Sequence, residues 1–193
     1  MRVTKDRVEA DRIVMKRLLI TFTLLSLYIG STTAPVLAQE MQHTPANCPA
    51  DAKSLPAALS AWTDKASLDA AVSAAGLNAA ALAPGKAVTV NLHHTRDVQY
   101  ITQPEKPGGS VAYGGLLMLD IKNAGTYQVN LSSGAWTDVL KDGAAVMSGA
   151  HAPGPACSGI RKTVQFPLQP GRYVIQLSAN GGPTIAVMVS RAP

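Results

Sequence analysis

The stretches GTYQVNLSSG (residues 125–134) and GRYVIQLSANGG (residues 171–182) share one pattern, and this pattern decides the fold. In both, Gly comes first, and then Tyr, Val or Ile, and Leu alternate with mostly polar residues. A period of two is typical of a β-strand with one apolar and one solvated face. We therefore predict two amphipathic strands that are counterparts in two facing sheets. The polar side chains expected on their solvated faces are Gln128, Asn130, Gln176 and Ser178.

Similar short apolar segments recur through the second half of the chain. The further strands that they predict cover residues 86–92, 97–101, 114–121, 135–141, 144–148, 162–168 and 184–190. Asp142-Gly143 between two of them is a strong hairpin signal. About nine strands with turn residues roughly every ten positions indicate an antiparallel sandwich or barrel rather than alternating βαβ units.

The residues before the strands are predicted to form other structure. Residues 39–85 read as an extended tail followed by short helices, at Ser54–Trp62 and within the Ala-rich stretch Asp64–Leu82. Pro84-Gly85 ends the helical region. The β-domain is then expected to cover residues 86–193.

Residues 1–38 are predicted to be a leader that does not belong to the folded domain. Met15-Lys16-Arg17 precedes the apolar run LLITFTLLSLYIG, and Val36 and Ala38 supply a small-x-small cleavage site. This is the pattern of a secretory signal peptide, and the run is shorter than the ~20 apolar residues of a membrane-spanning helix. The charged residues before Met15 fit no part of a signal peptide, so Met15 is the expected start. We predict a periplasmic or secreted protein with no membrane span after cleavage.

The positive charge of the chain lies mostly in this leader. Six of the 17 basic and three of the 12 acidic residues precede Gln39, so the remaining chain has a net charge of +2. It holds no cluster of five or more basic residues, and a nucleic-acid partner is therefore not expected.

Two cysteines, Cys48 and Cys157, lie in the mature chain. An even number in an exported protein predicts a disulfide, which would tie the N-terminal tail to a loop late in the domain. The alternative is a Cys₂His₂ metal site with His43 and His151, which stand shortly before the two cysteines. The two interpretations exclude each other.

Three segments between Tyr113 and Ser190 carry a resemblance to a known domain: GTYQVNL, AWTDVLKDGAAV and FPLQPGRYVIQLSANGG. Together they resemble the small jelly-roll domains of secreted bacterial proteases, known as the pre-peptidase C-terminal type. The likeness covers less than half of the chain. It implies a β-sandwich of jelly-roll type, and a fold does not imply a function.

A second resemblance covers most of the mature chain. PEKPGGSVAYGGLL, HAPGPACSGIRK and FPLQPGRYVIQLSANG are similar to segments of small exported alphaproteobacterial proteins of unknown function. Some of these relatives carry the name homogentisate 1,2-dioxygenase, which implies a ferrous iron held by two His and one carboxylate and an aromatic diol as substrate. No His-x-x-x-x-x-Glu-x-x-x-His-like arrangement occurs in this sequence.

Further residues are candidates for metal binding or catalysis. Met41 and His43 near the new N-terminus are ligand types that copper accepts. Ser158 lacks the G-x-S-x-G context of a nucleophile. Asp120 and Asp138 are the candidates for a general acid and base.

A binding face is the favoured prediction. Its candidate residues are Tyr113, Trp136 and Arg161, because aromatic rings stack on flat ligands and Arg161 suits an anion. The Gly-rich loop around PEKPGGS belongs to the same expectation, since functional groups concentrate on loops. The sequence thus predicts a non-catalytic binding or accessory protein without a cofactor, whose partner is a small molecule, a glycan or a protein. The alternatives are a periplasmic metal-binding protein, with copper or iron, and the dioxygenase.

Overall fold

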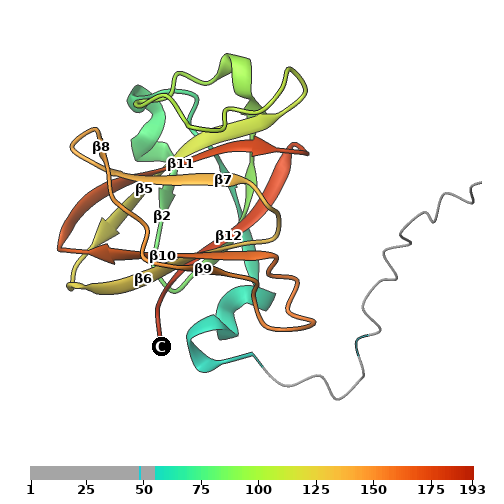
Figure 1. The fold of residues 1–193 in the computed structure, drawn as a ribbon, viewed down its shortest axis with the longest axis vertical. Helices are drawn as coiled ribbons and strands as arrows, with labels where there is room; N and C mark the ends of the chain where they lie inside the picture. Colours follow the sequence, from blue (N-terminus) through green and yellow to red (C-terminus); the bar gives the residue numbers. More distant parts are fainter. Residues whose placement is uncertain (1–47, 49–54) are drawn as a thin grey trace, which may run out of the picture. The chain divides into compact units, whose positions relative to one another are not determined.

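Two β-sheets pack face to face in this computed structural model, which describes Cys48 and residues 55–193 (Figure 1). Sheet A contains, in order across the sheet, β1 (Lys65–Asp69), β3 (Ala87–Asn91), β12 (Thr184–Arg191), β6 (Gly125–Leu131), β10 (Lys162–Leu168) and β9 (His151–Ala152). Sheet B contains β2 (Ala81–Leu82), β5 (Tyr113–Ile121), β11 (Gly171–Asn180), β7 (Trp136–Lys141) and β8 (Ala144–Ala145), with β4 (His93–His94) also pairing with β5.

Eight of these strands follow the jelly-roll order. Along the chain they are β3, β5, β6, β7, β8, β10, β11 and β12. Sheet A takes the first, eighth, third and sixth of them, and sheet B takes the second, seventh, fourth and fifth. The pairings among them are antiparallel, so the predicted antiparallel β-sandwich of jelly-roll type is confirmed. Parallel pairing of β1 with β3 and of β2 with β5 makes both sheets mixed at one edge.

The repeated Gly-x-Tyr pattern has the same structural role in both sheets. It begins β6 in sheet A and β11 in sheet B, so the two strands are counterparts in facing sheets, as predicted. The Tyr127 hydroxyl donates to the Asn123 carbonyl at 2.9 Å. The Tyr173 hydroxyl donates to the Gln169 carbonyl at 2.9 Å and accepts from the Gln169 amide at 3.0 Å. Each tyrosine therefore fixes the turn that precedes its own strand, in the manner of a tyrosine corner.

The prediction that the polar faces of these strands are solvated was wrong. Gln128, Asn130, Gln176 and Ser178 are all buried, and Asn130 has no exposed surface. On sheet A, the Asn130 amide donates to the Met188 carbonyl and accepts from the Thr163 hydroxyl. On sheet B, the light-green loop between β4 and β5 in Figure 1 crosses the outer face. The chain covers both outer faces with segments that a period of two does not reveal.

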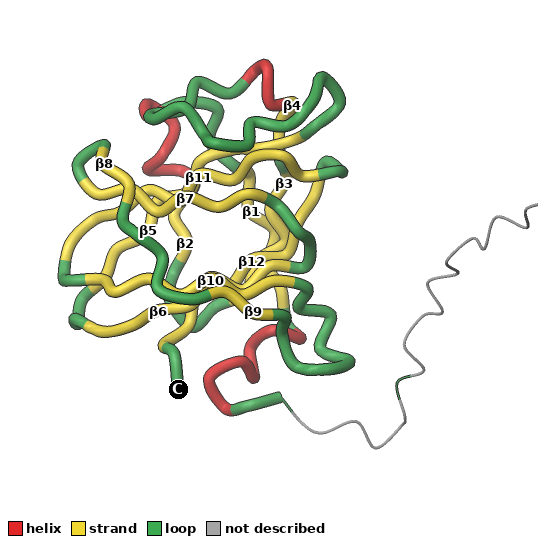
Figure 2. The backbone as a smooth tube through the Cα atoms, in the orientation of Figure 1, coloured by secondary structure: helices red, strands yellow, loops and turns green. Residues whose placement is uncertain are grey.

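The helical prediction for residues 64–82 was also wrong. Lys65–Asp69 forms β1, and the helical part of this stretch is the 3₁₀ turn η3 (Ala74–Ala79). The separate short helix predicted at Ser54–Trp62 corresponds to the 3₁₀ turn η2 (Ala57–Thr63); both turns are drawn in red in Figure 2. Helix propensity is a weak prior that tertiary pairing overrides. The alanines serve close packing instead, because Ala70 lies where a Cβ on Gly115 would collide with it. The strands of the sandwich therefore begin at Lys65 and not at Lys86.

The predicted strand over residues 97–101 was wrong as well. The chain forms the 3₁₀ turn η4 (Thr95–Asp97) and then a loop. In this loop the Ile101 amide donates to the Gln176 side chain at 2.8 Å, so the backbone bonds to a side chain of the sheet beneath and not to a neighbouring strand.

A second, smaller apolar cluster lies on the outer face of sheet A. Leu59 and Trp62 of η2 pack there with Ile160 and Met188. Trp62 is buried in this cluster, and its indole N–H donates to the Ser158 carbonyl at 2.9 Å. Next to Ser158, Cys157 forms the predicted disulfide with Cys48, with the Cα atoms 5.6 Å apart.

Candidate functional site

A cavity of about 380 Å³ opens at the edge of β7, and we call it the tryptophan pocket. Its walls are Lys106, Trp136, Thr137, Asp138, Val146, Ser148, His151, Lys162, Val164 and Phe166. The edge is open for a topological reason. The short β8 pairs with Leu140 and Lys141 only, so the segment from Trp136 to Asp138 has β11 on one side and the pocket on the other.

Two lysine side chains from different parts of the chain lie over the indole ring of Trp136. The Lys106 ammonium is 4.9 Å from the ring centroid and the Lys162 ammonium is 5.7 Å from it. Lys162 belongs to β10 in sheet A and alternates with Val164 and Phe166, which face the core. Its ammonium group reaches across to sheet B and donates to the Ala135 carbonyl at 2.8 Å. Such cation–π contacts attract each ammonium group to the indole ring and hold both positive charges next to it.

A carboxylate lies beside the same indole. The Trp136 indole N–H donates to Asp138 at 3.0 Å. Burial raises the pKa of the Asp138 carboxyl above its ordinary value, and hydrogen bonds from Trp136 and Gln176 offset part of the rise. Burial also lowers the pKa of the Lys162 ammonium, and the nearby charge of Lys106 lowers it further. Ionisable groups perturbed in this way, and gathered at one cavity, are typical of functional sites.

The loop that carries Lys106 is tied to sheet B. The Gln176 amide oxygen accepts from the Ile101 and Thr102 amides at 2.8 and 3.2 Å, and its nitrogen donates to the Thr102 carbonyl at 3.0 Å. Farther along, the Ser178 hydroxyl donates to the Lys106 carbonyl at 2.8 Å. These bonds join buried polar groups that would otherwise be unpaired. Moving the loop away would leave these groups without partners, and the cost of this stabilises the observed position of the loop. Lys106 is thereby placed over the pocket before any ligand arrives.

The structure brings together only some of the predicted binding residues. Trp136 lies at the centre of the tryptophan pocket, and the exposed His151 of β9 lines it. Tyr113 does not line it; its ring stacks on the ring of His94 with the centroids 4.5 Å apart. Arg161 directly precedes β10, is exposed and lies outside the walls of the pocket.

The alternative of a Cys₂His₂ metal site is contradicted by the disulfide, which uses both Cys48 and Cys157. His43 and Met41 lie outside the described residues. Within Cys48 and residues 55–193, no group of three His, Cys, Asp or Glu side chains is arranged to hold a metal ion. The described residues therefore do not by themselves fit the copper or ferrous iron that the sequence alternatives imply.

The candidate acid and base, Asp120 and Asp138, do not form a pair. They lie on β5 and β7, on either side of β11, opposite Arg172 and Gln176 respectively. Four residues of β-strand span about 13 Å, so the two carboxylates cannot share a proton. Ser158 has a turn role, since its hydroxyl donates to the Pro155 carbonyl and accepts from the Ile160 amide.

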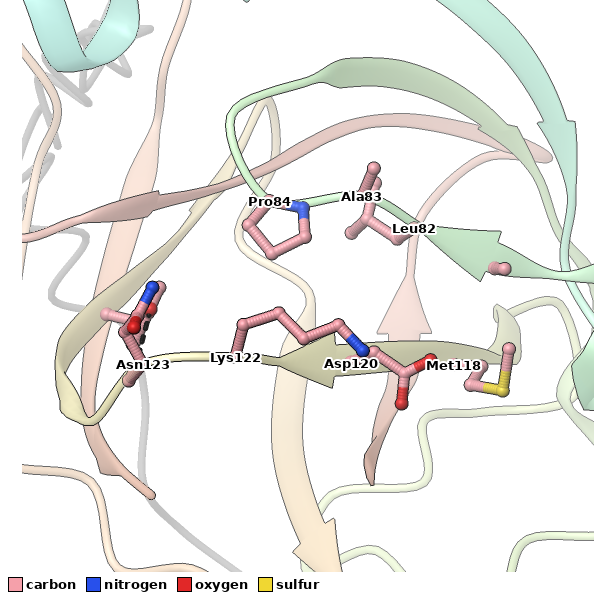
Figure 3. Close-up of a pocket in the computed structure, with 9 residues that line it drawn as sticks. Leu82, Ala83, Pro84, Met118, Asp120, Lys122 and Asn123 are labelled. Atoms are coloured by element: carbon pink, nitrogen blue, oxygen red, sulfur yellow. Dashed lines mark hydrogen bonds between the residues drawn. The ribbon is translucent and has the colours of Figure 1, made fainter. Parts of the chain in front are cut away.

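Asp120 lines a different and larger cavity, of about 510 Å³. Figure 3 shows Lys122 and Asp120 along one wall of this cavity and Ala83 and Pro84 across from them. The Asp120 carboxylate already has an ion-pair partner, because the Arg172 guanidinium lies 3.6 Å from it. The larger cavity thus offers a carboxylate that already has a partner, beside the Lys122 ammonium, whereas no charged group of the tryptophan pocket belongs to an ion pair within the described residues.

Sequence reasoning missed the two lysines of the pocket. Lys106 stands within the Gly-rich loop that was expected to be functional, but no residue pattern distinguishes it. A signal for Lys162 was present: it alternates with Val164 and Phe166 and is therefore a charged residue in the register of the apolar face. A lysine in that position must reach solvent or a ligand at the edge of the sandwich.

Comparison with known proteins finds no matching family model and no matching curated protein. The kind of ligand that the tryptophan pocket can bind is therefore inferred from the side chains that line it. None of the helices in the described part of the chain combines the length and apolar character that a membrane crossing needs.

Proposed function

We propose that this chain is an exported, non-catalytic binding protein that holds a small ligand in the tryptophan pocket and acts in the periplasm or outside the cell. Export is supported by the signal-peptide pattern of residues 15–38 and by the disulfide between Cys48 and Cys157, since disulfides persist in oxidising compartments.

The observation that carries the proposal is the preassembled state of the pocket. An indole, two ammonium groups and a partly buried carboxylate converge on one cavity, and hydrogen bonds from Gln176 and Ser178 hold the loop above it. The volume of about 380 Å³ lies within the range of small-molecule sites, about 300–1,000 Å³. A site that needs little ordering loses little free energy when it binds.

The hydrogen bonding of Asp138 favours binding over catalysis. A general base needs a carboxylate oxygen within reach of the substrate proton. Here the Trp136 indole N–H donates to the carboxylate at 3.0 Å, which orients Asp138 within the wall of the pocket. The metal-binding and dioxygenase functions remain rival proposals, supported by His43 and His151 as potential ligands and by the resemblance to exported relatives, respectively.

The test uses protein recovered from the periplasm of an expressing bacterium. Its melting temperature is measured with a panel of neutral sugars, sugar acids, aromatic carboxylates, amines and inorganic phosphate. We expect at least one compound to raise the melting temperature of the wild type but not that of Trp136→Phe with Lys162→Gln. Tyr113→Phe, which alters an aromatic residue outside the pocket, serves as the matched control.

Metal analysis and an activity assay of the same preparation address the rivals. A stoichiometric metal that disappears in His43→Ala with His151→Ala would support the metal-binding function. Turnover of an aromatic diol with added ferrous iron would support the dioxygenase. Either result, or a panel in which no compound stabilises the protein, would contradict the proposal.

A further inference from the structure

We infer that the ligand of the tryptophan pocket carries a single carboxylate that binds between the ammonium groups of Lys106 and Lys162. The inference rests on the proposed function, because it names the ligand class of the same site. It depends on the arrangement of charge around Trp136 and not on the size of the cavity.

The two ammonium groups lie over one indole ring although they repel each other. Their distances to the ring centroid are 4.9 and 5.7 Å, and the charge of Lys106 contributes to the lowered pKa of Lys162. Neither lysine belongs to an ion pair within the described residues, where the two ion pairs are Arg96–Asp97 and Arg172–Asp120. The Asp138 carboxylate offsets part of this repulsion at Lys162, and an anion placed between the two ammonium groups would relieve it further.

Hydrogen-bond donors are available for such an anion. An ammonium group has three N–H donors. Lys162 uses one of them on the Ala135 carbonyl, and its remaining donors have no partner among the described residues. Lys106 makes no side-chain hydrogen bond within that part of the chain either. The flexible four-carbon stems of the two lysines let each ammonium group turn toward one oxygen of a carboxylate, in charge-assisted bonds.

The other charged groups at the pocket favour one negative charge over two. Asp138 lies beside the indole, Glu105 acts on Asp138 from farther away, and His151 also lines the cavity. The carboxylate of Asp138 would repel the second charge of a phosphate dianion in this partly desolvated site. A monocarboxylate balances the lysines without that cost.

The walls indicate what the carboxylate is attached to. Val146, Val164 and Phe166 give the pocket an apolar side, which suits a ring or a short hydrocarbon body. Stacking of a neutral sugar on Trp136 is disfavoured, because the lysine ammonium groups already lie over the ring. An aromatic carboxylate and a sugar acid both carry a single carboxylate and differ in the body attached to it. The experiment below distinguishes these two kinds of ligand.

Matched probes test the charge directly. Phenylacetate is compared with phenylacetamide, and galacturonate with galactose, by isothermal titration calorimetry at low ionic strength. We expect one of the two carboxylates to bind at least about tenfold more tightly than its neutral partner, and added salt to weaken it. The carboxylate that binds more tightly identifies the body of the ligand. Inorganic phosphate is expected to bind more weakly than that carboxylate.

Variants assign the effect to the two lysines. Lys106→Gln and Lys162→Gln are each expected to lower the affinity about fivefold, the magnitude of a partly exposed charge pair of about 1 kcal/mol. Lys106→Arg keeps the charge and is expected to retain binding. Lys65→Gln is the matched control, because Lys65 lies 4.9 Å from the ring of the other tryptophan, Trp62, away from the pocket.

Three results would overturn the inference. Equal affinity for a carboxylate and its neutral partner would show that the pocket does not recognise the negative charge, and it would leave the proposed binding function intact. Tighter binding of phosphate than of either carboxylate would show that the pocket prefers a phosphate to a carboxylate. No saturable binding of either carboxylate at millimolar concentration would also overturn it, and the wider panel of melting temperatures would then decide the proposed function separately.

Discussion

Asp138 shows at the scale of one residue how burial and hydrogen bonding oppose each other. Burial disfavours the ionised carboxylate, and the Trp136 and Gln176 donors favour it, with burial the larger effect, so its pKa is raised. Between the ordinary value of about 3.9 and the raised value, the folded protein binds more protons than the unfolded chain. Stability therefore falls as the pH rises through this window.

Asp138→Asn should remove this dependence. Because Asn never ionises, the variant lacks the loss of stability that the wild type shows in this window. We therefore expect the unfolding free energy of the variant minus that of the wild type to increase as the pH rises from about 4 into the mildly acidic range. Urea unfolding at a series of pH values measures the difference. Asp64→Asn, which removes an exposed carboxylate outside the pocket, is the control. A difference for Asp138→Asn that does not change with pH would refute the assignment.

At the scale of the element, the two Gly-x-Tyr strands differ in one respect. Tyr127 makes one hydrogen bond to the turn before β6, whereas Tyr173 makes two to the turn before β11. Both rings are buried in the core. The same sequence pattern therefore closes two turns, and the turn before β11 depends more on its tyrosine.

Replacement of each tyrosine by phenylalanine tests this difference. Tyr127→Phe should lower the unfolding free energy by about 1 kcal/mol, and Tyr173→Phe by about 2 kcal/mol, because it leaves both the amide and the carbonyl of Gln169 without their partner. Chemical denaturation of the two variants gives the comparison. Tyr100→Phe, whose hydroxyl also donates to a backbone carbonyl, that of Leu177, is the control for loss of one such bond. Equal losses for Tyr127→Phe and Tyr173→Phe would contradict the expectation.

At the scale of the whole molecule, the disulfide joins positions that are 109 residues apart in the sequence. It holds Cys48 beside the loop that ends at Ile160, and Ile160 packs with Leu59, Trp62 and Met188 on the outer face of sheet A. A covalent loop of this length removes much of the conformational freedom of the unfolded chain.

Reduction of the disulfide should therefore destabilise the sandwich. Loop-closure entropy sets the expected loss of unfolding free energy at up to about 5 kcal/mol. Calorimetry of the oxidised protein, the reduced protein and Cys48→Ser with Cys157→Ser measures it, and the last two should agree. An unchanged melting temperature after verified reduction would show that the native contacts suffice without the bond.

Much of the fold was predictable because its signals are local. The period of two located seven of the main strands, and Asp142-Gly143 marked the β7–β8 hairpin, where both residues adopt the positive φ values that this turn requires. The site was only partly predictable. Trp136 and His151 were expected as site residues, but Lys106 and Lys162 meet at Trp136 only because a loop folds over sheet B and β10 faces the edge of β7.

The sequence by itself determined that the chain forms a β-sandwich and that its N-terminal segment has the pattern of an export signal, and it favoured a disulfide between its two cysteines. These properties depend on alternation, composition and short motifs, which neighbouring residues set. Only the tertiary structure decided that residues 65–69 form a strand, that the polar faces of β6 and β11 are buried, and that two lysines share one indole. Each of these depends on which distant segment covers a surface, and no local pattern of side chains specifies that partner.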